Sequence, residues 1–518
     1  MSRLLVVADM ETLRGGIRPG WSTTSGTADS MSREEADVLE ALPDDNAPAY
    51  SHERRTAQDT VTASLAGASP TPFWLDSVDR PRPSHPLRAD LSADLVVVGG
   101  GYCGLWTALI AKETDPERDV VLIEAREVGW AASGRNGGFC ESSLTHGPEN
   151  GERHFASELE LLDRLANQNF AELEATIERY GIDAEFEKTG VLVAATEPHQ
   201  IEQLRAAAAD TPDAVFLDEK EVRRAIRSPL YRAGLRKTKG YAYVHPAKLV
   251  WGLKRACVEM GVRIFEGTPA TRLSRSRRSV NVHTPAATIR ARQVALATNG
   301  FPSLLKRTSL LTVPIYDYAL MTEPLTTAQL ESIGWTTRHG ITDSSRQFHY
   351  SRLTADNRIL WGGFDAIYHR GGEVRDDQDQ RRETFETLAD HFFTTFPQLR
   401  DVRFTHAWGG MIDMSSRLVA FHGRAYGGQV AYSAGYTGLG VGATRFGAKV
   451  MLDLLGGRET ELTRLRMVTS KPLPIPPEPI AYPVIQTIRR AVAKSDANGG
   501  RDGLILGAMN RLGVSFDS

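Results

Sequence analysis

The stretch that decides the fold reads DLVVVGGGYCGLWTALIAKETDPERDVVLIEAREVGWAASGRNGG and occupies residues 94–138. Residues 95–98 form a short apolar run, which is typical of a strand buried in a parallel sheet. The glycines that follow match G-x-G-x-x-G at Gly99, Gly101 and Gly104. In this motif they permit a tight turn, a close approach of the backbone to a pyrophosphate, and close packing of helix on strand. The pattern predicts a nucleotide-binding βαβ unit.

The predicted helix of this unit covers residues 102–114 and directs its positive N-terminal end at the phosphates. A second apolar run, residues 120–123, ends at Glu124, about 20 residues past Gly104. A carboxylate at this distance is suited to bind both ribose hydroxyls and would repel the 2′-phosphate of NADP. The predicted ligand is therefore FAD or NAD, and an ordinary βα turn without a ligand is the less favoured interpretation.

The composition is that of a soluble globular protein. The chain has 518 residues, a formal net charge of −3 and 41% hydrophobic residues. This length allows two or three domains, and the charge gives no basic footprint for nucleic acid. No apolar run approaches the ~20 residues that span a bilayer, and the N-terminus is a poor signal peptide, so we expect a cytoplasmic protein. Three scattered cysteines favour neither a disulfide framework nor a metal site.

The two ends of the chain differ from its middle. Residues 1–70 are rich in Ser, Thr, Asp, Glu and Gly without sustained periodicity, and we expect a disordered extension. A short helix is expected within it after the capping box of Ser32 and Glu35. At the other end, the proline run of residues 472–479 is expected to be extended. The amphipathic helix that follows is expected to dock on the body, with contact to a membrane surface as the alternative.

Several motifs together resemble the D-amino-acid-oxidase-like family of FAD-dependent oxidoreductases. They are GGGYCGL at residues 99–105, Glu124-Ala125-Arg126, SGRNGG at 133–138, ATNG at 297–300, TADNRILWGGFDA at 354–366, WGG at 408–410 and GYTGLGV at 435–441. Within the family, the chain looks most similar to gamma-glutamylputrescine oxidases and aminophosphonate oxidoreductases. The resemblance extends over residues 73–470. It implies an α/β fold in which a discontinuous, Rossmann-like FAD-binding domain carries a substrate domain with a mostly antiparallel sheet.

The same resemblance divides the chain. Residues 71–150, 241–310 and 402–470 are assigned to the FAD-binding domain. Residues 151–240 and 311–401 are assigned to the substrate domain, in which the alternating, aromatic-rich segment from 313 to 363 is typical of an antiparallel sheet. Residues 471–518 are read as a Pro-rich linker and an amphipathic tail.

The cofactor contacts implied by these motifs come from small residues and from loops ahead of helices. SGRNGG supplies backbone N–H groups and room for a flat ring, while GYTGLGV precedes a helix whose N-terminus favours the charge of a reduced flavin. The residues expected to bind FAD are Gly99, Gly101, Gly104, Glu124, Ala125, Arg126, Ser133, Asn136, Gly137, Gly138, Thr298, Gly300, Gly435, Thr437, Gly438, Leu439 and Gly440.

Two departures from relatives concern the flavin. Many relatives carry His where this chain has Leu439, so no role of that His is transferred here. Some relatives bond FAD covalently through a cysteine in the C-terminal half or a histidine just after the small-residue loop. This chain has no cysteine beyond Cys257, and Arg135 and Asn136 occupy the loop, so we expect non-covalent FAD.

The resemblance implies oxidation of a C–N bond. A hydride passes from the carbon beside the nitrogen to flavin N5, the imine is hydrolysed, and O2 or another acceptor reoxidises the flavin, with H2O2 formed from O2. No second G-x-G-x-x-G follows a strand, which favours a flavin reduced by the substrate, a small-molecule amine or amino acid. Such a reaction needs positioning and desolvation of the amine more than it needs a side-chain base.

Aromatic residues of the antiparallel sheet are the candidates for the substrate pocket. The sheet offers Tyr316, Tyr318, His349 and Tyr350. Of these, Tyr318 and His349 lead, and Trp408 is a candidate wall beside the flavin ring. Aromatic residues on strands more often serve core packing, and a lone strand histidine is more often structural than catalytic. Arg352 has the chemistry to bind a carboxylate, but Asp356 offers it a structural partner.

Alternatives remain at the level of the sequence. One is a flavin dehydrogenase of the same fold that passes electrons to a quinone or a carrier protein. Another is a tailoring oxidase that acts on a biosynthetic intermediate. A third class is an NAD-binding dehydrogenase or a non-catalytic nucleotide-binding module, which the SGRNGG and GYTGLGV loops disfavour. The oligomeric state is left open.

Overall fold

The computed structural model describes residues 48–51, 53–511 and 514. The described residues all belong to one compact unit, and everything below concerns that unit. The helix expected after Ser32 lies outside the described residues.

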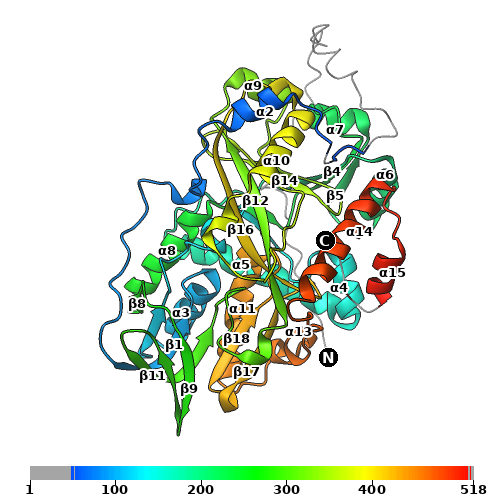
Figure 1. Ribbon diagram of the computed structural model, residues 1–518. Helices are drawn as coiled ribbons and strands as arrows, with labels where there is room; N and C mark the ends of the chain where they lie inside the picture. The colour runs from blue at the N-terminus through cyan, green and yellow to red at the C-terminus, as the bar shows by residue number, and fades with distance from the viewer. Residues whose placement is uncertain (1–47, 52, 512–513, 515–518) are drawn as a thin grey trace, which may run out of the picture. The chain divides into compact units, whose positions relative to one another are not determined.

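The first sheet is built around the βαβ unit and collects strands from distant parts of the sequence (Figure 1). Its central strand β1 pairs in parallel with β2 on one side and β11 on the other, which confirms the Rossmann-like arrangement. The strand order is β17-β18-β11-β1-β2-β8, with β10 and β9 extending from β11. The bounds are β1 Leu91–Val98, β2 Val120–Ile123, β8 Arg263–Phe265, β9 Arg272–Ser276, β10 Ser279–His283, β11 Thr288–Leu296, β17 Phe421–Ala425 and β18 Val430–Ala434.

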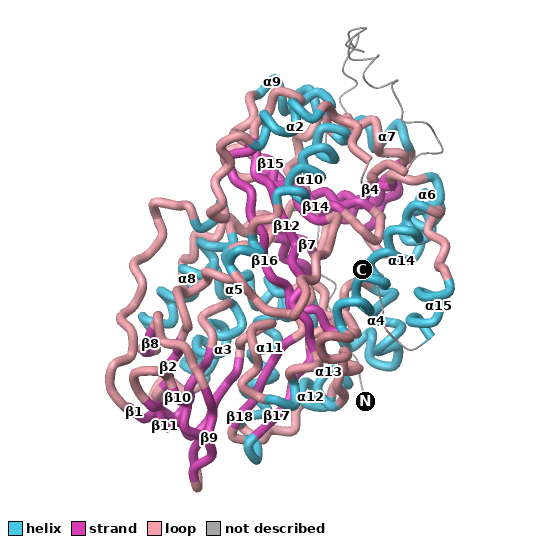
Figure 2. Tube along the Cα trace, viewed as in Figure 1, coloured by secondary structure: helices cyan, strands magenta, loops and turns pink. Residues whose placement is uncertain are grey.

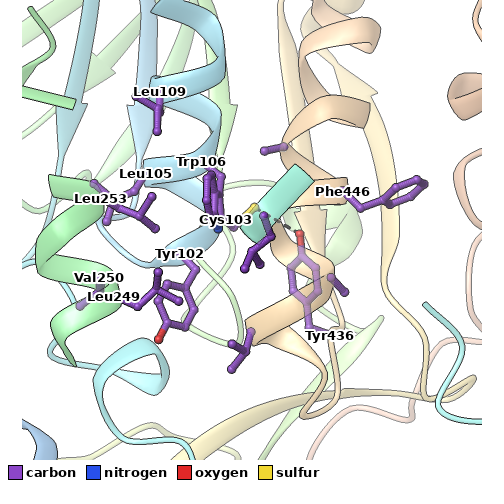
Figure 3. Close-up of a cluster of buried hydrophobic side chains, with 14 of the residues drawn as sticks. Tyr102, Cys103, Leu105, Trp106, Leu109, Leu249, Val250, Leu253, Tyr436 and Phe446 are labelled. Carbon is purple, nitrogen blue, oxygen red and sulfur yellow. Dashed lines mark hydrogen bonds between the residues drawn. The ribbon is translucent and has the colours of Figure 1, made fainter. Parts of the chain in front are cut away.

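Three helices pack side by side to form the main core next to this sheet: α3 (Tyr102–Thr114), α8 (Pro246–Glu259) and α11 (Gly440–Leu455). Their facing side chains, among them Trp106 and Leu253, are fully buried (Figure 3). Glycine is required where α3 leaves the sheet, because a Cβ on Gly104 would lie 1.9 Å from the carbonyl oxygen of Gly99.

The second sheet has the order β16-β12-β15-β14-β13-β4-β6-β5. All of its neighbouring strands are antiparallel except β13 and β4, so the expectation of a mostly antiparallel sheet is confirmed. Strand β16 had been expected with the FAD-binding segments, but it pairs along β12 instead. The bounds are β4 Val191–Ala195, β5 Ala214–Leu217, β6 Ala233–Lys237, β12 Thr312–Thr322, β13 Gly340–Asp343, β14 His349–Leu353, β15 Ile359–Gly363 and β16 Phe404–Ser415.

Helix α10 (Arg382–Thr395) covers one face of this sheet and buries Phe385, Leu388 and Phe392 in a separate core. Figure 2 shows strands β12 and β16 running between the two sheet regions. A short ribbon pairs β3 with β7. The remaining strands and helices are β3 Phe139–Glu141, β7 Tyr241–Tyr243, α4 Pro148–Phe155, α5 Leu159–Arg179, α6 Pro198–Asp210, α7 Glu219–Ala225, α9 Thr327–Ile333, α12 Glu461–Arg464 and α13 Arg466–Thr469.

The expected disorder of residues 1–70 is wrong for the part that the structure describes. Helix α2 (Gln58–Leu65) packs against α10 and buries Val61 completely. The carboxylate of Asp390 accepts hydrogen bonds from the backbone N–H groups of Arg55 (3.1 Å) and Thr56 (2.6 Å). The segment is polar in composition because few of its side chains are buried, and its order comes from these tertiary contacts.

The C-terminal tail docks on the body, as expected. Helices α14 (Ala481–Ala497) and α15 (Leu504–Arg511) lie beside α6 and α4 (Figure 1). Asp496 accepts hydrogen bonds from the backbone N–H groups of Gln347 (2.9 Å) and Arg346 (3.2 Å), which fixes the tail against the loop before β14. Among the described residues, no helix combines the length and the apolarity that crossing a membrane requires.

Candidate functional site

A cavity of about 1270 Å³ joins the two sheets. The glycine-rich turn, Glu124 and residues 129–137 line one part of it, and the second sheet contributes Asp317, Tyr350 and Trp408. The first turns of α11 and the apolar side of α14 complete the wall. The cavity therefore extends from the nucleotide-binding turn to the antiparallel sheet without a break.

Glu124 holds the glycine-rich turn in shape. One carboxylate oxygen accepts a hydrogen bond from the N–H of Gly100 (2.6 Å), and the other accepts from the N–H of Arg126 (2.9 Å) and Nε1–H of Trp130 (3.0 Å). Burial raises the pKa of Glu124, and these three donors oppose the rise. A carboxylate offers about four acceptor positions, so one position is left for a ribose hydroxyl.

The SGRNGG loop is preorganised by its own side chains. The Ser133 hydroxyl accepts a hydrogen bond from the N–H of Tyr102 (2.9 Å), which ties the loop to the start of α3. The Asn136 side chain accepts from the N–H of Gly138 (2.8 Å) and donates to the carbonyl of Ala132 (2.9 Å). A Cβ on Gly137 would lie 2.8 Å from the Tyr350 ring, so a larger residue would close the space between loop and sheet.

Asp413 of β16 fixes the loop ahead of α11. Its carboxylate accepts hydrogen bonds from the N–H groups of Gly435 and Tyr436, the latter at 3.1 Å. Burial raises the pKa of Asp413 to about 7. The loop presents Thr437, Gly438 and Leu439 to the cavity just before the positive end of a long helix.

Most of the expected cofactor contacts line this cavity, and a few do not. Gly104, Arg126, Gly138, Gly300 and Gly435 lie behind the lining residues. The Arg126 side chain turns outward, pairs with Asp376 at 2.8 Å and covers the Trp130 ring. The glycine-rich turn, the one remaining acceptor position of Glu124 and the helix ends together fit a dinucleotide with an extended flat ring.

Strand alternation decides which side chains of the second sheet face the cavity. Asp317 and Ala319 of β12 lie on the same face as Trp408 and Gly410 of β16, their partners in register. Trp408 donates a hydrogen bond from Nε1 to the carbonyl of Arg135 (2.9 Å), which places this face against the SGRNGG loop. Trp408 therefore lines the cavity where the sheet contacts this loop, and its predicted place beside the flavin ring stays a prediction.

His349 is not brought to the cavity. Its ring is 2% exposed, and its Nδ1 lies 2.9 Å from Asp343 and its Nε2 3.0 Å from Nδ1 of His391. Trp361 and Phe364 stack on it. His349 is therefore a structural residue whose two ring nitrogens both have hydrogen-bond partners. It lies on the face of β14 that packs against α10.

Tyr318 borders the cavity, but its ring turns to the α10 side. The ring packs edge-on against Phe385 with centroids 5.7 Å apart, and the hydroxyl donates to the carbonyl of Gln378 (2.7 Å). Both leading candidates therefore lie on the opposite face of the sheet from Trp408. The sequence predicted the strands, but not which face of the sheet lines the cavity.

Arg352 does not pair with Asp356, whose carboxylate binds Arg358 at 2.7 Å instead. The buried Arg352 guanidinium donates to the carbonyl of Val244 (2.6 Å) and lies over the rings of Trp74 and Tyr243. It is engaged in the structure and does not line the cavity.

Sequence reasoning missed Asp317, and it named Asp317's partner Tyr350 only as one of the aromatic residues that the sheet offers. The Tyr350 hydroxyl donates to the Asp317 carboxylate at 2.6 Å, and both line the cavity. Burial raises the pKa of Asp317 to about 6, and the Tyr350 hydrogen bond works against that rise. The sequence signal for Asp317 was an acidic residue in an otherwise apolar, alternating strand, because an acid is rarely placed there without a partner.

The parallel sheet with its glycine-rich turn, and a cavity that continues from it to an antiparallel sheet, define a flavin-dependent oxidoreductase. Residues 94–454 match the family model described as FAD dependent oxidoreductase, abbreviated DAO. The chain belongs to this family, and its cofactor is FAD.

Individual relatives agree with this assignment. The chain is similar to the gamma-glutamylputrescine oxidoreductase of Escherichia coli, with 29% identity over 398 residues, 74% of this chain and 88% of that protein. Among solved structures, the glycine oxidase of Geobacillus kaustophilus matches with a TM-score of 0.58 at 18% identity, over 71% of this chain and 96% of that one. The fructosamine oxidase of Aspergillus fumigatus matches with a TM-score of 0.60 at 16% identity, over 73% and 89%. These structures share the fold.

Proposed function

We propose that the protein is an amine oxidase with non-covalently bound FAD. Bound FAD would supply the hydride acceptor for the carbon beside the substrate nitrogen, and O2 would be the final electron acceptor, giving H2O2. The imine product is then hydrolysed. The similarity to gamma-glutamylputrescine oxidoreductase supports an amine substrate.

The chain's own residues bind and orient the cofactor. Glu124 would bind the ribose, and the N-terminus of α3 would bind the pyrophosphate. The loop held by Asp413 would present N–H groups to the polar edge of the flavin. The sequence has no cysteine beyond Cys257, and Arg135 and Asn136 occupy the loop where some relatives carry a histidine, which supports non-covalent attachment.

The observation that carries the proposal is the continuity of the cavity. The glycine-rich turn and the carboxylate of Asp317 line one space together with Trp408, Tyr350 and apolar residues of α14. A largely apolar space of this kind would orient a small amine against a flat ring and limit access of water to the reacting carbon.

The test is the visible spectrum of the purified protein, recorded without oxygen before and after addition of pooled amines and, separately, pooled amino acids. We expect a flavin spectrum that bleaches with an amine, and H2O2 formation after oxygen is admitted. Release of free FAD on denaturation would confirm non-covalent binding. A folded protein without flavin, or a flavin that no amine reduces, would contradict the proposal. Fast dye reduction with slow H2O2 formation would favour the dehydrogenase instead.

A further inference from the structure

We propose that Asp317 is the anionic group that binds the substrate amine as its ammonium and takes up the ammonium proton before hydride transfer, so that the cavity selects cationic amines over amino acids. This inference rests on the proposed function and names the substrate class of the same site. Its evidence is the position of the Asp317 carboxylate on β12 and the residues that surround it.

The position of Asp317 is opposite the flavin loop. In the sheet register it lies across from Gly410, and a Cβ on Gly410 would approach Cβ of Arg135, the central residue of the SGRNGG loop, to 3.5 Å. Tyr350 bonds one carboxylate oxygen of Asp317. Since Tyr350 also lies within contact distance of Gly137, the carboxylate is held at the point where the sheet meets the loop.

No cation of the protein neutralises this carboxylate. Among the described residues, none forms an ion pair with Asp317, and its hydrogen-bond donors are the Tyr350 hydroxyl and backbone N–H groups. Trp408 and Gly410 of β16 bring no charge, and Arg135 of the loop is paired with Asp379. Asp317 is partly exposed to the cavity, and a partly buried anion without a counterion favours a ligand that brings one.

The guanidinium groups of the cavity are already paired, which disfavours a substrate carboxylate. Among the described lining residues, those of Arg135, Arg346 and Arg489 are each paired with a carboxylate: Asp379, Asp502 and Asp365 respectively. The lining lysine, Lys237, lies near a second, partly exposed carboxylate, Glu141, which also accepts a tyrosine hydrogen bond (2.8 Å, from Tyr241). An amino acid that binds its carboxylate to one of these guanidinium groups would have to break an ion pair, whereas an amine needs only Asp317.

The probe for this inference is tert-butylammonium, whose carbon beside the nitrogen carries no hydrogen and cannot lose a hydride. Binding is measured on the FAD-loaded protein from the perturbation of the visible flavin spectrum. Two probes of matched shape, tert-butanol (neutral) and pivalate (anionic), separate charge from size. The variants are Asp317→Asn, Asp317→Glu, and Asp377→Asn as a control that removes an exposed carboxylate outside the cavity lining.

We expect tert-butylammonium to bind the wild-type protein, and Asp317→Asn to weaken that binding at least tenfold. Asp317→Glu should retain part of it, and Asp377→Asn should leave it unchanged. Equal binding by wild type and Asp317→Asn, in protein that retains its flavin, would overturn the anchor while leaving an amine-reducible flavin intact. Preference for pivalate would overturn it as well. Conversely, Asp317-dependent binding in a protein that no amine reduces would keep the anchor and reject the proposed function.

Discussion

Replacing Tyr350 by Phe tests the cavity-facing pair in a way that loss of structure cannot imitate. The Tyr350 hydroxyl stabilises the charged form of Asp317 and thereby lowers the pKa of that carboxyl. A hydrogen bond to a charged group is worth about 1.5–3 kcal/mol, and about 1.4 kcal/mol corresponds to one pKa unit. In Tyr350→Phe the pKa of Asp317 should therefore rise from about 6 by roughly 1 to 2.

The assay is the pH dependence of amine binding and of kcat/KM. The wild-type enzyme should lose affinity for an amine as the pH falls through about 6, because protonation of Asp317 removes the anion. In Tyr350→Phe the loss should begin at higher pH. The free energy of folding responds to pH in the opposite direction. Burial raises the pKa of Asp317 above its value in the unfolded chain, so protonation of this group stabilises the folded protein. The same protonation removes the anion that binds the amine.

Tyr318→Phe is the matched control, because it removes a phenolic hydroxyl from the same sheet on its other face. Loss of its bond to the Gln378 carbonyl should cost stability of about 1 kcal/mol and leave the pH profile unmoved. A profile that stays at the wild-type position in folded, flavin-loaded Tyr350→Phe would refute the reasoning. So would an equal displacement in Tyr318→Phe, since it would mean that the face of the strand does not matter.

Three further changes address the cofactor and the two ends of the chain. Glu124→Ala leaves three N–H donors of the nucleotide turn without their acceptor and should weaken FAD retention by roughly 100-fold, measured by flavin content after dialysis; full retention would contradict the ribose role. Deletion of residues 1–70 should lower the free energy of unfolding by roughly 2–3 kcal/mol relative to deletion of residues 1–47, from the lost burial of Val61 alone. Denaturant unfolding measures the difference, and equal midpoints would show that α2 contributes nothing. Deletion of residues 471–518 removes α14 from the cavity wall and should increase quenching of flavin fluorescence by iodide severalfold, whereas unchanged quenching would mean that the tail does not shield the site.

The sequence predicted the nucleotide half of the site well, because its signals are local. The turn at Gly99–Gly104 needs specific backbone conformations and close approaches within a few residues, and Glu124 follows directly from the next strand. The same holds for α3, whose observed bounds agree with the expected helix over residues 102–114. Such features leave a fixed spacing in the sequence.

Long-range pairing is not recorded in local spacing. Strand β16 was assigned to the FAD-binding segments from the family resemblance, yet it completes the other sheet through its pairing with β12. The polar composition of residues 48–70, without sustained periodicity, favours disorder. Their order depends on α10 and Asp390, which lie more than 300 residues further along the chain.

By itself, the sequence determined the family, the cofactor and the existence of an aromatic, alternating sheet opposite the flavin loop. Tertiary structure alone decided which side of that sheet is the site. Tyr318 and Asp317 are neighbours in the chain, but successive side chains of a strand point to opposite faces, so one lies under α10 and the other in the cavity. Both faces of this sheet are covered, one by α10 and one by the FAD-binding half, so both carry apolar and aromatic residues. The alternation of residues along these strands therefore has no polar face that would mark one side of the sheet. Only tertiary packing decides which face lines the cavity.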